Sequence, residues 1–78
     1  MQTIEDRVRA IMATVFGVEP SEIVETTSQD TLAKWDSLRQ MNLIVALEEE
    51  FNITLGDEQV LELLTFPLVC TVIKEATG

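Results

Sequence analysis

The chain contains no histidine and no tyrosine, and both cysteine and basic residues are scarce. Without histidine, neither a Ser-His-Asp nor a Cys-His arrangement can be built, so the sequence does not predict an enzyme. No glycine-rich loop follows a strand to cradle a phosphate. The single cysteine, Cys70, cannot form an internal disulfide. Because it lies among apolar residues, we interpret it as a small buried side chain in a protein of a reducing compartment.

Positive charge is also in short supply, with 5 Lys and Arg against 14 Asp and Glu in 78 residues and a formal net charge of −9. No basic stripe is available to neutralise phosphates, so nucleic acid and anionic membranes are poor partners and basic proteins are favoured. No apolar run approaches the roughly 18 residues of a membrane span. Residues 1–10 carry too many charges for a signal peptide. We therefore expect a cytoplasmic protein and, in solution, a monomer.

Metal ligation is not expected either. Glu48, Glu49 and Glu50 are consecutive, and consecutive positions of a helix point in different directions. The Asp-x-Asp-x-Asp-Gly loop of calcium sites is missing. The acidic run is better explained as a solvated helical face.

Apolar periodicity predicts an all-α fold with three longer helices and one short helix. The first helix is expected over residues 3–16, with Thr3 as its N-cap and Gly17 as its stop. Asp57 is expected to cap a short helix that runs through Leu64, and Thr65 is expected to open the last one. Residues 68–73 are rich in β-branched side chains and would suit a strand, but an isolated strand has no pairing partner.

The segment between the first two long helices, residues 17–36, is too long for a simple connection. We expect Ile23, Val24 and Leu32 to pin it to the core. With no repeat, low-complexity tract or linker, residues 1–78 are interpreted as one domain.

The second helix, expected over residues 37–51, carries two apolar stripes. When successive residues are placed about 100° apart around the helix axis, one stripe lies well over 100° away from the other. The first must face the core. The second, edged by acids, is either buried in a bundle or exposed as a docking strip, and periodicity alone leaves both interpretations open. The core stripe comprises Leu43, Ile44, Leu47 and Phe51; the second comprises Leu38, Met41 and Val45 with Glu48 and Glu49.

Ser37 lies where this helix begins, after a polar loop. Its simplest interpretation is structural, because Ser37 and Gln40 match a capping box and Asp36 alone could also cap the helix. The surrounding sequence favours a second interpretation. Trp35-Asp36-Ser37-Leu38, followed by Ala-Leu-Glu-Glu-Glu-Phe at residues 46–51, resembles the acyl carrier proteins.

The resemblance implies a four-helix bundle of acyl-carrier type, with a long loop between helices one and two, over nearly the whole chain. It implies that Ser37, beside Asp36, carries a covalent 4′-phosphopantetheine arm whose phosphate would be favoured by the helix N-terminus. It also implies that the helix docks partner enzymes through Leu38, Arg39, Met41, Val45, Glu48 and Glu49.

The function implied is that of an acyl shuttle in fatty-acid or specialised acyl biosynthesis, and hence in lipid metabolism. Its partners would be a phosphopantetheinyl transferase and acyl-loading and acyl-using enzymes with basic docking surfaces. The Lys34-Trp35 pair, Arg39 and Asn42 depart from the common fatty-acid form and look more like carriers of specialised pathways. Two alternatives stay open: an aminoacyl or peptidyl carrier, and an unmodified acidic helical interaction module.

Overall fold

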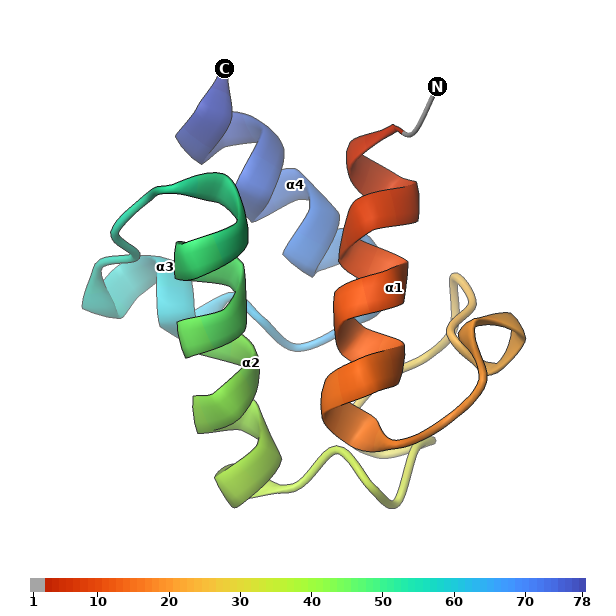
Figure 1. Cartoon of the computed structure of the whole chain (residues 1–78). Helices are drawn as coiled ribbons and strands as arrows, with labels where there is room; N and C mark the ends of the chain where they lie inside the picture. Colours follow the sequence, from red (N-terminus) through yellow and green to blue (C-terminus); the bar gives the residue numbers. More distant parts are fainter. Residues whose placement is uncertain (1–2) are drawn as a thin grey trace.

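The computed structural model describes residues 3–78 and builds them from helices, with no strand in that range (Figure 1). The all-α prediction is therefore confirmed. Among these residues, no helix is both long and apolar enough to span a membrane. The helices are α1 (Ile4–Phe16), the short 3₁₀ helix η1 (Pro20–Glu22), α2 (Ser37–Phe51), α3 (Asp57–Leu61) and α4 (Phe66–Thr77).

Helix α1 begins and ends where its sequence signals predict. The Thr3 hydroxyl accepts the Asp6 backbone N–H at 3.1 Å, and the Asp6 carboxylate accepts the Thr3 N–H at 3.4 Å, which completes a capping box. Gly17 ends the helix in the left-handed region, with φ 69°, where a side chain would be strained. The capped helix presents one face of completely or almost completely buried side chains: Val8, Met12 and Phe16.

Helix α3 differs from the prediction at both ends. Its N-cap is Gly56, whose N–H donates to the Gln59 side chain at 2.8 Å, so Asp57 is the first helical residue and not the cap. The helix stops at Leu61 because the chain turns to place Leu63 in the core, where it is 0% exposed. Thr65 caps α4 as expected, since its hydroxyl accepts the N–H of Leu68.

The long loop between α1 and α2 is held against the helices by buried side chains. Ile23 is 1% exposed and Leu32 packs partly against the core, as predicted. The expectation for Val24 is wrong, since 47% of it is exposed. The buried hydroxyl of Thr27 accepts the Val24 N–H at 2.8 Å and closes a tight turn that directs Val24 outward. The Thr27 carbonyl in turn accepts the N–H of Phe66, which ties the loop to the start of α4.

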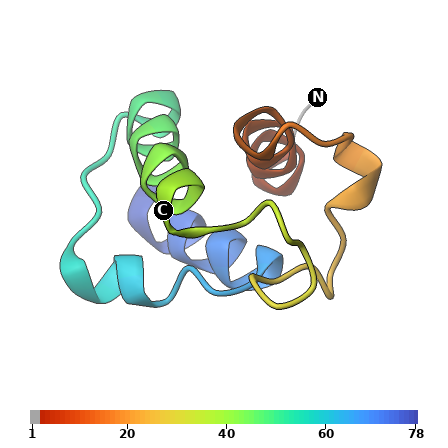
Figure 2. The same ribbon diagram turned by 90° about the horizontal axis from the view of Figure 1, so that it is seen from below.

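The core lies between α1, α2 and α4. Seen from below, α1 and α2 run beside each other and α4 crosses beneath them (Figure 2). The start of α1 and the end of α4 lie at one end of the molecule, and the start of α2 lies at the other (Figure 1). The buried apolar side chains are Val8, Met12, Ala13, Phe16, Ile23, Trp35, Leu43, Leu47, Leu55, Leu63, Phe66, Val69, Cys70, Val72 and Ile73.

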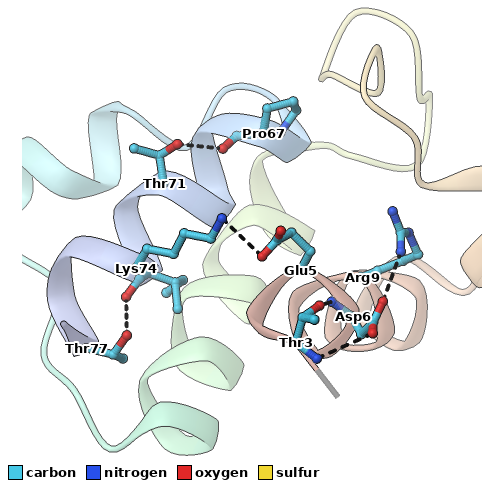
Figure 3. A network of polar contacts seen from close by, with 9 residues as sticks. Thr3, Glu5, Asp6, Arg9, Pro67, Thr71, Lys74 and Thr77 are labelled. Carbon is cyan, nitrogen blue, oxygen red and sulfur yellow. Dashed lines mark hydrogen bonds and ion pairs between the residues drawn. The ribbon is translucent and has the colours of Figure 1, made fainter. Parts of the chain in front are cut away.

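An ion pair on the surface joins α1 to α4 (Figure 3). The Lys74 ammonium lies 3.1 Å from the Glu5 carboxylate. This hydrogen bond from Lys74 lowers the pKa of Glu5. A lowered pKa means that the pair stabilises the fold above the unfolded-state pKa of a glutamate and loses that effect as the pH falls through the folded-state value. Because the pair is exposed, its contribution is small.

Candidate functional site

The junction at which α2 begins is fixed by Asp36. Its carboxylate accepts the Arg39 backbone N–H at 2.9 Å, and its carbonyl accepts the N–H of Gln40 at 2.8 Å. Asp36 has extended backbone angles and is the N-cap, which makes Ser37 the first helical residue. The capping box of Ser37 and Gln40 is therefore not formed, because the helix starts one residue earlier than that pattern requires.

The hydroxyl of Ser37 is left free by this arrangement. Ser37 is exposed, and none of the hydrogen bonds found within residues 3–78 involves its Oγ. It lies on the first turn of α2, and α2 begins at the end of the molecule opposite the start of α1 and the end of α4 (Figure 1). A rigid helix thus presents an unengaged nucleophilic oxygen to solvent.

Arg39 is turned back toward the junction. Its guanidinium lies 2.9 Å from the second carboxylate oxygen of Asp36. A cation near a helix N-terminus opposes the macrodipole, and this pair offsets that cost. Arg39 therefore adds less free positive charge to the surface of α2 than its sequence position suggests.

Trp35 anchors the loop immediately before the junction, a role that the sequence analysis missed. Its ring is 2% exposed and lies against Phe16, with 5.2 Å between ring centroids. Its indole N–H donates to Oε1 of Gln40 at 2.6 Å, and the Gln40 amide nitrogen donates to the carbonyl of Leu63 at 3.4 Å. Trp35 precedes the N-cap and Gln40 is the fourth helical residue, the two positions of a hydrophobic staple. The five-residue separation of Trp35 and Gln40 across the helix start was the feature of the sequence from which this contact could have been predicted.

The two stripes of α2 have different environments. Leu43 and Leu47 are 0% exposed, and Ile44 and Phe51 pack partly against the core. The second stripe faces solvent, so the interpretation that it is buried in the bundle is excluded. Its exposed fractions are 71% for Leu38, 66% for Met41 and 53% for Val45.

The acids beside that stripe are not equivalent. Glu49 is exposed, as expected of a rim residue. Glu48 is half-buried, and its carboxylate accepts the Leu55 backbone N–H at 2.9 Å. The expectation that Glu48 lies on an open acidic rim is wrong, because its carboxylate binds the backbone of the segment that follows α2.

Two further apolar side chains are exposed near α3, on the segment where the sequence analysis expected the short helix to continue. Leu61 is 74% and Leu64 is 52% exposed, whereas Leu63 between them is fully buried. The bond from Gln40 to Leu63 places this turn beside α2. The part of the chain that the structure describes contains no cluster of acidic, cysteine or histidine side chains suited to a metal ion.

Comparison with known proteins agrees with this geometry. Residues 6–73 match the family model described as the phosphopantetheine attachment site. The fold is similar to the solution NMR structure of holo acyl carrier protein from Geobacter metallireducens, with a TM-score of 0.83 and 25% identity. That match covers 96% of this chain and 86% of the other. Domains of this kind are non-catalytic shuttles with a phosphopantetheine prosthetic group. The chain belongs to the phosphopantetheine attachment-site family, as a carrier of acyl-carrier type.

Proposed function

We propose that Ser37 is the attachment residue and that the holo protein carries acyl groups to enzymes of fatty-acid or specialised acyl biosynthesis. The observation that carries this proposal is the exposed Ser37 hydroxyl, unengaged on the first turn of α2, in a chain that matches the attachment-site family over residues 6–73. Localisation in the cytoplasm and a monomeric state form part of the same proposal.

The residues around Ser37 suit a phosphodiester. The first N–H groups of a helix have no acceptor within it. Here Asp36 accepts only the N–H of Arg39 with its side chain and that of Gln40 with its carbonyl, so the Ser37 and Leu38 N–H groups remain for an anion. The macrodipole adds to this preference. The negative charge introduced with the arm would therefore be stabilised where Ser37 places it.

Attachment uses the oxygen of Ser37 and a base supplied by the transferase. Ser37 Oγ forms a bond to the phosphorus of the phosphopantetheinyl group of coenzyme A, the bond from that phosphorus to the nucleotide phosphate breaks, and the hydroxyl proton passes to the transferase. Asp36 keeps the junction in place by its cap. When bound, the arm supplies a terminal thiol that holds the acyl group as a thioester, and tethering raises the effective concentration of cargo at each partner.

The docking surface that we propose combines exposed apolar side chains of α2 and α3. A patch of large apolar side chains on a small monomer marks an interaction site. On α2 it comprises the second stripe, and beside α3 the two exposed leucines extend it. Its members are Leu38, Met41, Val45, Leu61 and Leu64.

The charge outside this patch favours a basic partner. Four of the five basic side chains pair with a carboxylate and the fifth, Lys34, contacts only a carbonyl, so most of the unpaired charges on the surface are acidic. The pairs are Arg7 with Glu50, Arg9 with Asp6, Arg39 with Asp36, Lys74 with Glu5, and Lys34 with the Gly17 carbonyl.

We expect Glu49→Lys to slow loading of Ser37 at low salt. The change weakens attraction to a basic transferase, and the difference from wild type should shrink as the Debye length falls from about 10 Å at 0.1 M to about 3 Å at 1 M salt. Loading rates over a salt series measure it. Glu75→Lys in α4 changes the net charge equally and should have less effect. Equal rates and salt slopes in all three proteins would contradict docking through this acid.

Cys70 should stay unreactive in the native protein, so that thiol reagents report on the arm. Cys70 is 4% exposed, and burial raises the pKa of its thiol, with the negative charge of Glu5 adding to the rise. Only the thiolate is nucleophilic. We expect the apo protein to react with a maleimide only after unfolding, and the holo protein to show one fast-reacting thiol. Rapid labelling of native apo protein would contradict this.

The proposal is tested by intact mass after incubation with coenzyme A and a transferase of broad carrier tolerance. A gain of one phosphopantetheinyl group on Ser37 supports it; an unchanged mass would overturn it and favour an unmodified acidic interaction module. Loading of the holo protein with an acyltransferase or with an adenylating enzyme then separates acyl cargo from the aminoacyl or peptidyl alternative.

A further inference from the structure

The side-chain amide of Gln40 connects three segments around the junction. Its Oε1 accepts the Trp35 indole N–H at 2.6 Å, and its Nε2 donates to the Leu63 carbonyl at 3.4 Å. Trp35 ends the long loop, Gln40 lies one turn into α2, and Leu63 follows α3. Figure 2 shows this loop running into α2, and it shows α3 and α1 on opposite sides of α2. A single residue therefore links the loop, the attachment helix and the α3 turn.

Each bond meets a requirement that another side chain would leave unmet. The Trp35 ring is almost completely buried against Phe16, and a buried indole N–H needs an acceptor. The Leu63 carbonyl lies just beyond α3, where carbonyls have no partner within the helix. A glutamine amide offers an acceptor and donors together, whereas a glutamate lacks the donor and a methionine has no donor and only a weakly accepting sulfur.

Ser37 lies within the segment that these bonds fix. Trp35 holds the chain before it, and Gln40 holds the turn after it. The buried Leu63 also separates the exposed Leu61 and Leu64, so the same amide sets where those two side chains lie relative to Ser37. The hydroxyl and both parts of the apolar patch are thereby held as one unit.

We propose that Gln40 is a positioning residue for phosphopantetheinyl transfer, which presents Ser37 and the α3 leucines to the transferase in one preorganised arrangement. This inference rests on the proposed attachment at Ser37. A docking face that is ordered before binding avoids an ordering cost when the complex forms. Without the amide, the partner must order the loop and the α3 turn itself, so KM rises. Ser37 keeps its hydroxyl and the Asp36 cap, so kcat stays close to that of wild type.

The test compares Gln40→Met, Gln40→Glu and Trp35→Phe in steady-state transfer from coenzyme A by a broadly tolerant transferase. Loss of hydrogen bonds of ordinary strength predicts a rise in KM of about two- to tenfold for Gln40→Met. Gln40→Glu keeps the acceptor for Trp35 and loses the donor to Leu63, so its tryptophan emission should match wild type while KM still rises. Trp35 is the sole tryptophan and tyrosine is absent, so emission reports on this site alone.

Two controls separate positioning from general destabilisation. Gln29→Met makes the same chemical change at an exposed loop residue, and Val72→Ala removes buried volume in α4. Both should leave KM unchanged while they remain folded. An unchanged KM in folded Gln40→Met and Trp35→Phe would overturn the inference, as would a fall in kcat alone. If wild type itself is not loaded, the proposed function fails; if it is loaded with the KM of the variants, only this inference fails.

Discussion

Replacing Ser37 with alanine is expected to abolish phosphopantetheinylation and to leave the fold intact. The Ser37 hydroxyl makes no hydrogen bond among the described residues, and the helix cap is the neighbouring Asp36. Removing an exposed, unengaged hydroxyl should change the free energy of unfolding by less than about 0.5 kcal/mol. Loss of an N-cap would cost about 0.5–2 kcal/mol, so stability also tests which residue caps α2. Intact mass after treatment with transferase and coenzyme A measures loading, and urea melts measure stability.

Ser21 supplies the matched control. It is another exposed serine, on the short helix η1, and Ser21→Ala should be loaded at the wild-type rate. Asp36→Ala completes the set, since it should keep the nucleophile and lose the cap. A mass gain in Ser37→Ala would place the attachment elsewhere, and peptide mapping of the modified protein would identify the residue.

Much of the fold could be predicted because its signals are local. Helix α2 covers residues 37–51 as predicted, and Thr3, Gly17 and Thr65 act as the caps and the stop that their types indicate. The prediction errors arise where a tertiary contact determines the exposure of a side chain or the length of a helix. Val24 is exposed because the Thr27 hydroxyl closes a turn, and α3 is shorter than expected because Leu63 enters the core.

In the candidate site too, the features set by neighbouring residues could be predicted and those set by tertiary contacts could not. Asp36 and Ser37 could be identified from adjacent residues, and helical periodicity separated the two stripes of α2 but left open whether the second one is exposed. The link from Trp35 through Gln40 to Leu63 could not, because its second bond spans 23 residues of sequence. Likewise, Glu48 looks like any surface acid until the chain after α2 brings the Leu55 N–H to it. Side chains that bond to backbone groups of another segment carry no periodic signal.

Leu47→Ala should destabilise the fold much more than substitutions on the exposed stripe of α2. Leu47 is 0% exposed, and removing a buried leucine side chain costs about 2–5 kcal/mol through lost burial and the cavity left behind. Domains of ordinary stability unfold with only about 5–15 kcal/mol, so a chain this small loses a large share. Met41→Ala and Val45→Ala should cost under about 1 kcal/mol, because their side chains face solvent and alanine has the higher helix propensity. Urea midpoints at constant m-value measure all three.

The same three variants separate folding from docking when they are assayed in the transfer reaction. Met41→Ala and Val45→Ala remove parts of the proposed apolar patch, so their KM for the transferase should rise although their stability hardly changes. Leu47→Ala leaves the patch in place, so its KM should match wild type under conditions in which it is folded. The free energy of unfolding and KM would then change independently, because α2 uses one face for packing in the core and the opposite face for docking. Equal destabilisation by all three substitutions would mean that the exposed stripe acts as core, and unchanged KM in both patch variants would remove it from the docking surface.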